Sequence, residues 1–279
     1  MIESTAKILV EARKKRYAIG AFEVWSLESI QVVIKAAEFF NVPVILQIGP
    51  LEAAYAGIKD LSLVALELAK RSCVPVALHL DHGDSFELAL EAIHCGFTSV
   101  MIDASAKALK ENITITREIV KAAHACQVDV EGELGRLAGV EGYQDVKEEE
   151  VLETNPQEAL DYVKETGIDF LAVAIGTAHG FYKKEPRINI ERLKEIAKMV
   201  SCPLVLHGGS GLREEVIRES IKWGISKVNI CTEFVCAFGE GIAKAYNRPD
   251  RKDNVPSIFN LSKEQALELI KNKIRIFSI

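Results

Sequence analysis

The chain alternates short apolar runs with longer helical segments eight times, and this alternation is the feature that most limits its fold. The apolar runs are rich in β-branched residues, as expected of strands buried in a parallel sheet. The segments between them carry apolar residues at helical spacing. The predicted strands are 17–24, 43–48, 76–81, 99–103, 128–134, 170–175, 204–207 and 227–231, and the predicted helices are 27–40, 60–72, 85–95, 108–126, 157–167, 189–200, 213–223 and 233–246.

Eight βα units favour a closed barrel over an open, doubly wound sheet, which normally has a glycine-rich first turn. The length of 279 residues also suits a barrel, which typically needs about 250. We therefore expect an α/β fold, a (β/α)8 TIM barrel forming one domain over residues 1–279. An amphipathic helix over 1–16 precedes it, and a polar, proline-bearing stretch over 249–260 leads to a C-terminal helical extension over 261–274.

Composition and charge exclude several classes of protein. The net charge is −6, and basic residues are scattered among acidic ones, so nucleic acid is not an expected partner. Acidic residues near the start argue against a signal peptide, and no apolar segment is long enough for a membrane span. The cysteines form no C-x-x-C pair, which predicts buried thiols in a reducing cytoplasm. They are Cys73, Cys95, Cys126, Cys202, Cys231 and Cys236.

Three histidines, His82, His179 and His207, each follow a short apolar run. At the carboxyl ends of barrel strands they would converge on one mouth, and three imidazoles with an open fourth position describe a catalytic zinc site. A single strand-end histidine is more often an ordinary hydrogen-bonding group, so the metal prediction depends on all three. We expect a core or supporting role for His79, and structural or solvent-facing roles for His94 and His124 in helices.

Other polar residues stand at predicted strand ends, and burying even a neutral polar group without a partner costs roughly 2–7 kcal/mol. Their carboxylates are therefore expected near a cation. These residues are Asp81, Asp103, Glu131, Glu133 and Asn229.

Two glycine-bearing or polar turns, 208–211 and 229–232, follow the seventh and eighth predicted strands, the usual phosphate site of this architecture. Glycine also serves ordinary tight turns, so this signal alone is weak. A third loop, 136–142, has glycines on both sides of Glu141 and predicts a movable carboxylate that could transfer a proton. Most loop glutamates are merely solvated.

Six motifs stand in order along nearly the whole chain: LHLDH, MIDAS, GELGRLAG, AIGTAHG, LVLHGGSG and KVNICTE. Together they closely resemble the class II, zinc-dependent ketose-bisphosphate aldolases, the fructose- and tagatose-bisphosphate aldolase group. The resemblance implies a lyase of carbohydrate metabolism, such as glycolysis. Its substrate is then a ketose 1,6-bisphosphate or ketose 1-phosphate, and its products are dihydroxyacetone phosphate and an aldehyde, which is glyceraldehyde 3-phosphate for the bisphosphates.

The resemblance also implies roles for single residues. His82, His179 and His207 match zinc ligands, and Asp103 and Glu133 match positions that flank the metal or host an alternative metal position. Asp81 matches the acid/base on the aldehyde side, and Glu141 the mobile-loop base. The substrate-binding residues are then Gly180, Gly208, Gly209, Ser210, Asn229, Ile230, Cys231 and Thr232. The implied cofactors are Zn²⁺ and a monovalent cation, Na⁺ or K⁺, and the implied assembly is a homodimer or homotetramer.

The chain departs from the family pattern toward the aldehyde side and in the loops. It has Glu23 in place of Asn, Gly49-Pro50 in place of Ser, Ala106-Lys107 after Ser105 in place of His-x-Pro, and Val255-Pro256-Ser257 in place of Asp-Pro-Arg. A carboxylate about 4 Å from a second phosphate costs on the order of 4 kcal/mol at an effective dielectric of 20. The departures leave the aldehyde open.

Two alternatives remain. One is a phosphosugar-binding homologue without turnover. The other is a metallohydrolase on the same barrel, which usually has a His-x-His pair on its first strand, where this chain has Phe22-Glu23-Val24.

Overall fold

The computed structural model describes the chain except residues 142–143, 148–149, 183–184, 251–253 and 279. Its main sheet is a closed barrel with the strand order β1-β10-β9-β8-β5-β4-β3-β2, and neighbouring strands pair in parallel. The predicted (β/α)8 TIM barrel is thus confirmed. The barrel strands are β1 (Ile19–Glu23), β2 (Val44–Ile48), β3 (Val76–Gly83), β4 (Ser99–Ile102), β5 (Asp129–Leu134), β8 (Phe170–Val173), β9 (Leu204–Leu206) and β10 (Ile225–Ile230).

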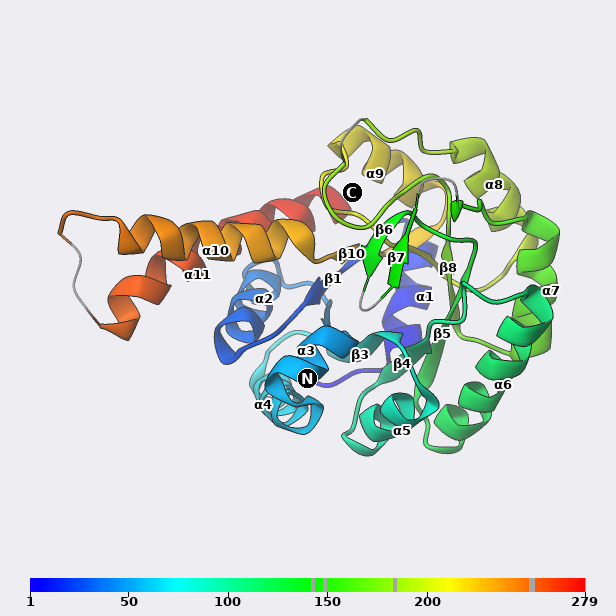
Figure 1. Cartoon of the computed structure of the whole chain (residues 1–279), viewed down its shortest axis with the longest axis horizontal. Helices are drawn as coiled ribbons and strands as arrows, with labels where there is room; N and C mark the ends of the chain where they lie inside the picture. The colour runs from blue at the N-terminus through cyan, green and yellow to red at the C-terminus, as the bar shows by residue number, and fades with distance from the viewer. Residues whose placement is uncertain (142–143, 148–149, 183–184, 251–253, 279) are drawn as a thin grey trace.

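Helices surround the barrel on its outside (Figure 1). Each predicted helix between strands is present, and α3 is an additional short helix that begins with Pro50 after the Gly49 N-cap. The helices are α1 (Thr5–Lys15), α2 (Leu27–Phe40), α3 (Pro50–Ala56), α4 (Ile58–Arg71), α5 (Phe86–His94), α6 (Leu109–Ala125), α7 (Pro156–Thr166), α8 (Ile190–Met199), α9 (Glu214–Lys222), α10 (Thr232–Tyr246) and α11 (Val255–Phe277).

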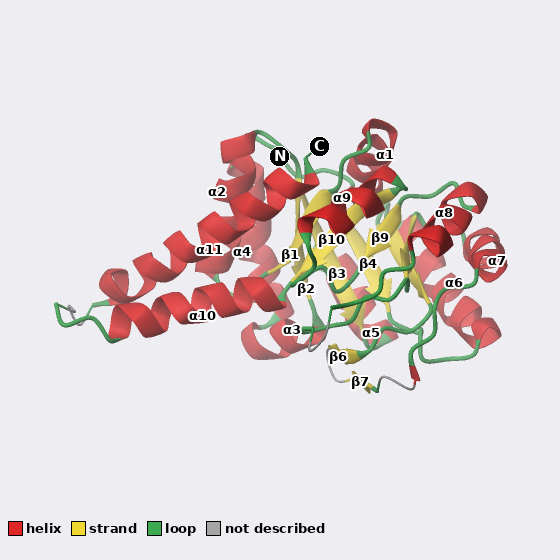
Figure 2. Ribbon diagram, turned by 90° about the horizontal axis from the view of Figure 1, so that it is seen from above, coloured by secondary structure: helices red, strands yellow, loops and turns green. Residues whose placement is uncertain are grey.

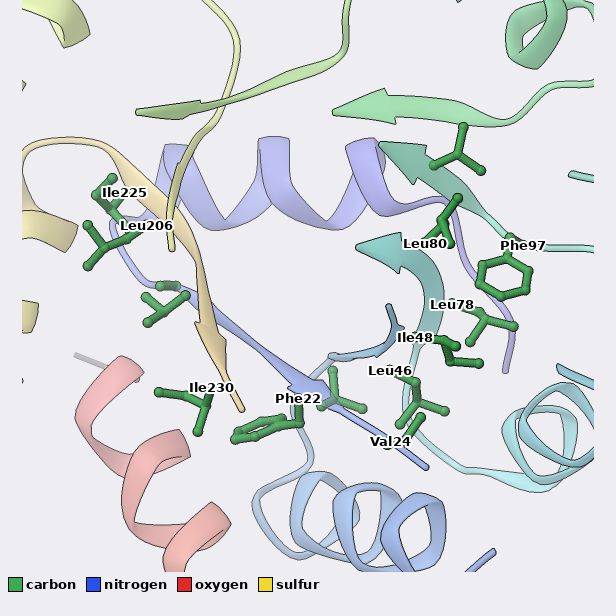
Figure 3. Close-up of a cluster of buried hydrophobic side chains, with 14 of the residues drawn as sticks. Phe22, Val24, Leu46, Ile48, Leu78, Leu80, Phe97, Leu206, Ile225 and Ile230 are labelled. Atoms are coloured by element: carbon green, nitrogen blue, oxygen red, sulfur yellow. The ribbon is translucent and has the colours of Figure 1, made fainter. Parts of the chain in front are cut away.

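Side chains alternate between the two faces of each strand, and this alternation divides the core. The outward-facing side chains pack beneath the helices; Phe22, Leu46 and Leu78 belong to this layer (Figure 3). The inward-facing ones form a second apolar cluster that includes Ala21 and Phe170, and Leu9 of α1 packs against it. Helix α1 closes one end of the barrel, so the polar inward residues are left to the other end (Figure 2).

Two elements extend the barrel plan. Strands β6 (Gly139–Glu141) and β7 (Gln144–Val146) pair as an antiparallel hairpin; β6 lies in the segment 136–142 that was predicted as a loop, and β7 follows it. Helices α10 and α11 form a hairpin that projects sideways from the barrel (Figure 1). The C-terminal helix starts earlier than predicted because Asn254 Oδ1 accepts from Ser257 N at 3.0 Å and proline is tolerated in a first helical turn.

The prediction that all six cysteines are buried is wrong. Cys202 is buried, but Cys73 and Cys126 are exposed because they lie in the turns that follow α4 and α6. Among the described residues, no helix combines the length and apolar character needed to cross a membrane.

Candidate functional site

The three histidines predicted as metal ligands meet at the open end of the barrel. His82 lies near the end of β3, His179 follows β8, and His207 directly follows β9. Their ring centroids are 4.6 Å (His82–His207), 5.2 Å (His82–His179) and 6.1 Å (His179–His207) apart. One ring nitrogen from each lies within 4.8 Å of the others, which is close enough for a single cation.

The backbone around two of these histidines is specialised. His82 has a φ of 45°, in the left-handed region that non-glycine residues rarely adopt, and the β3–β4 register shifts there. Such local strain is typical of functional positions. His179 N donates to Ala138 O at 2.8 Å, so the segment leading into β6 fixes the His179 backbone.

Carboxylates orient the imidazoles. His207 Nε2 donates to Glu131 Oε1 at 2.7 Å, and His82 Nδ1 donates to Asp103 Oδ2 at 3.1 Å. When one ring nitrogen of a histidine donates a hydrogen bond in this way, the tautomer is fixed and the other ring nitrogen is the one that can bind a metal. Burial, together with the nearby His82, lowers the pKa of His207 and favours the neutral form that binds metals.

The donor set fits a divalent cation. Within the described part of the chain, His207 Nδ1 and Glu133 Oε2 are buried and have no hydrogen-bond partner. Burial and the neighbouring Asp103 raise the pKa of Glu133 well above its usual value, so a cation would relieve the cost of ionising this carboxylate. His82, Asp103 and Glu133 also form a second group close enough to hold an ion.

A third cluster, His79, Asp81 and Glu131, already contains a cation. Lys227 Nζ lies 2.7 Å from Glu131 Oε2 and 3.7 Å from Asp81 Oδ1, and the side chains of Lys227 and Glu131 are fully buried. His79 is fully buried beside them and hydrogen bonds to Ser99 Oγ at 2.8 Å, as expected of a core residue. Sequence reasoning missed Lys227, although the two-residue alternation of β10 places it on the same face as Asn229.

Asp81 is held by two amides. Gln47 Nε2 donates to Asp81 Oδ2 at 2.8 Å, and Asn229 Nδ2 lies 3.0 Å and 3.1 Å from the two carboxylate oxygens. Burial acts to raise the pKa of Asp81, but the charge of Lys227 and the nearby imidazoles outweigh it and leave that pKa below its usual value. Asp81 is therefore ionised at neutral pH.

The predicted phosphate residues form a cradle beside this carboxylate. Six of them line one pocket at the mouth: Gly180, Gly208, Ser210, Asn229, Cys231 and Thr232. Gly208 has a φ of 67°, and a Cβ there would lie 2.3 Å from Ala178 O, so the close backbone approach requires glycine. Helix α10 begins at Thr232, Glu233 N donates to Ser210 Oγ at 3.3 Å, and the dipole of the helix favours an anion at this end.

Two other predicted substrate residues, Gly209 and Ile230, do not line that pocket. Gly209 N donates to Asn229 O at 3.1 Å, and the Ile230 side chain packs in the outer hydrophobic layer. Glu141 is the last residue of β6, and its side chain lies outside what the structure describes.

The departures from the family pattern fall in different places. Glu23 and Gly49 line the mouth pocket. Lys107 is exposed and forms an ion pair with Glu111 at 3.4 Å. The 255–257 segment starts α11 at the outer tip of the projecting hairpin, away from the mouth of its own barrel (Figure 1).

Comparison with known proteins agrees with this geometry. The family model described as "Fructose-bisphosphate aldolase class-II" matches residues 3–279. A fructose-bisphosphate aldolase of Thermus caldophilus is 38% identical over 300 aligned positions, covering 99% of this chain and 98% of the relative. The YdjI aldolase of Escherichia coli K12 superposes with a TM-score of 0.89 at 35% identity, covering 100% of this chain and 98% of that one. A putative fructose-1,6-bisphosphate aldolase of Coccidioides immitis gives 0.88 at 29% identity, covering 98% and 95%.

Proposed function

The chain belongs to the class II fructose-bisphosphate aldolase family, and on that premise we propose that it is a zinc-dependent aldolase. It reversibly cleaves a ketose 1-phosphate or ketose 1,6-bisphosphate to dihydroxyacetone phosphate and an aldehyde. The observation that supports this most is the convergence of His82, His179 and His207 beside the ionised Asp81 and a glycine-rich cradle.

In this proposal the cradle binds the phosphate on C1, and His82, His179 and His207 hold the metal. Asp103 and Glu133 flank it or offer an alternative position. A bound Zn²⁺ supplies Lewis-acid stabilisation of the negative charge that develops on the substrate oxygen. A monovalent cation, Na⁺ or K⁺, assists phosphate binding.

Asp81 takes the proton of the C4 hydroxyl as the C3–C4 bond breaks, so that C4 becomes the aldehyde carbon. The electron pair of that bond remains on the triose fragment, and Glu141 delivers a proton to C3. Asp81 releases its proton to solvent and Glu141 regains one, so the reaction consumes no net proton. Because the pKa of Asp81 lies below its usual value, Asp81 is ionised at neutral pH and can act as this base.

Chelation and one substitution test this function. We expect cleavage of fructose and tagatose phosphates to be lost in EDTA and restored by zinc. Asp81→Ala should lower kcat by about 10²–10⁴-fold, the usual contribution of general acid–base catalysis, with zinc content unchanged in metal analysis. EDTA-insensitive cleavage would contradict the proposal. Thermal stabilisation by dihydroxyacetone phosphate without cleavage of any ketose phosphate would instead support a phosphosugar-binding protein.

We also propose a homodimer or homotetramer located in the cytoplasm. The α10–α11 hairpin projects beyond the barrel (Figure 2) and supports the assembly, because exposed apolar side chains such as Val235 and Val255 lie on these two helices. The six free cysteines support a reducing compartment.

A further inference from the structure

One side of the mouth is built almost entirely from hydrogen-bond acceptors. It consists of Glu23, Gln47 and Asp81 at the ends of β1, β2 and β3, which we call the acceptor wall. All three are buried and line the same pocket as the phosphate cradle. Glu23 Oε1 accepts from Gly49 N at 2.5 Å, Glu23 Oε2 accepts from Gln47 Nε2 at 3.0 Å, and Gln47 Nε2 also donates to Asp81 Oδ2 at 2.8 Å.

These contacts fix which atoms remain for a ligand. Because Gln47 Nε2 donates to two carboxylates, the orientation of the amide is fixed, and Gln47 Oε1 is the atom that remains available to a ligand. Similarly, Asn229 turns its Nδ2 to Asp81. Among the described residues, Gln47 Oε1 and Asn229 Oδ1 are buried and have no hydrogen-bond partner. A buried acceptor without a donor is costly, and the hydroxyl groups of a sugar are suitable donors.

Part of the acceptor wall lies across the mouth from part of the phosphate cradle. In the strand order of the closed barrel, β2 is four strands from β8 and β3 is four strands from β9, whereas β1, which carries Glu23, is next to β10. A substrate whose phosphate lies against the cradle residues that follow β8 and β9 therefore directs its other end toward Gln47 and Asp81, with Glu23 beside them.

The wall also carries negative charge. A Cβ placed on Gly49 would lie 3.0 Å from Glu52 Oε2 and 3.3 Å from Glu23 Oε1, so these two carboxylates converge beside the pocket. A phosphate offers acceptors and charge of the same sign, and both oppose binding here. An uncharged polyol offers donors.

We propose that the acceptor wall binds the hydroxyl groups of an unphosphorylated aldehyde, so that the substrate class is a ketose 1-phosphate and not a ketose 1,6-bisphosphate. This inference rests on the proposed aldolase function. Glu23 is the specificity-determining residue, because its charge excludes the second phosphate and its oxygens orient Gln47.

Equilibrium binding of uncleavable analogues tests the wall separately from turnover. Calorimetry of the zinc enzyme should give a Kd for a hexitol 1-phosphate lower than that for the hexitol 1,6-bisphosphate, by on the order of tenfold or more. Kinetics should give the same order in kcat/KM for fructose 1-phosphate and fructose 1,6-bisphosphate. Preserved binding preference without cleavage would refute the aldolase function and leave the wall intact.

Glu23→Gln should reduce or reverse the preference by improving bisphosphate binding. Because Glu23 is buried and Glu23→Gln could misfold, Glu52→Gln is a second variant, expected to shift the ratio the same way but less. Glu118→Gln, an equal charge change on the exposed outer face of α6, should leave the ratio unchanged. Tighter binding of the bisphosphate by the wild type, or an unchanged ratio in both folded mouth variants, overturns the inference.

Discussion

Replacing Lys227 by methionine would test whether the buried ammonium beneath Asp81 neutralises Glu131. Both side chains are fully buried, and the pair is 2.7 Å apart. Removing one partner of such a pair leaves an uncompensated charge, and this typically costs about 3–5 kcal/mol. For a domain of this size about 2–4 °C of Tm corresponds to each kcal/mol, so Lys227→Met should lower Tm by roughly 10 °C.

The loss of stability in Lys227→Met should become smaller as the pH falls. Burial acts to raise the pKa of Glu131, but Lys227 and two histidines outweigh it, so the folded-state pKa lies well below 4.5. An acid with a depressed pKa stabilises the fold above its unfolded pKa and loses that contribution as pH falls through the folded value. The difference between wild type and Lys227→Met should therefore be largest near neutral pH and shrink below about pH 4.5.

Urea unfolding monitored by circular dichroism measures both effects. The double variant Glu131→Gln/Lys227→Met should recover roughly half of the loss or more, because Glu131 no longer carries a charge and Asp81 keeps its hydrogen bonds from Gln47 and Asn229. A Lys227→Met protein as stable as the wild type at pH 7 would refute this reasoning. So would a double variant less stable than the single one.

Two further predictions concern the cradle and the assembly. Gly208→Ala should weaken dihydroxyacetone phosphate binding severely, because its Cβ would lie 2.3 Å from a backbone oxygen. In Gly180→Ala the added Cβ would have nothing within 4 Å, so this variant should cost only the strain of its φ of 85°, about 1–2 kcal/mol. A calorimetric ranking of the two variants in the reverse order would contradict the proposed phosphate cradle. Light scattering should give a mass two or four times the 30.8 kDa of one chain. Val255→Asp should shift the protein toward the monomer. A wild-type protein that is monomeric at all concentrations would exclude the proposed assembly.

Much of the fold was predictable because the barrel repeats one pattern. Short apolar runs that alternate with helical segments along the chain are typical of buried parallel strands, and eight such units are typical of a closed barrel. The hairpin of β6 and β7 was missed because each strand has three residues, too few for a two-residue alternation to be recognised. The early start of α11 was missed because the segment 249–260 is polar and contains proline, although proline is tolerated in the first turn of a helix.

The residues of the site likewise divide into those that a sequence pattern predicts and those that it does not. The convergence of His82, His179 and His207 follows from strand ends alone, since any parallel barrel gathers them. The importance of Gln47 and Lys227 does not, because an inward-facing amide or ammonium has no distinguishing local pattern. Gln47 contacts Glu23 and Asp81 on the two neighbouring strands. Lys227 contacts Glu131 and Asp81 across the barrel, so its role depends on closure.

Closure also has a consequence for the order of folding. His179 and His207 follow neighbouring strands, but β3, which carries His82, reaches them only after the ring is complete. A partly assembled sheet therefore offers at most two of the three imidazoles. An ion that needs all three binds only the finished ring, and its binding energy stabilises that state and no earlier intermediate. The metal would therefore stabilise the closed barrel at the last step of folding.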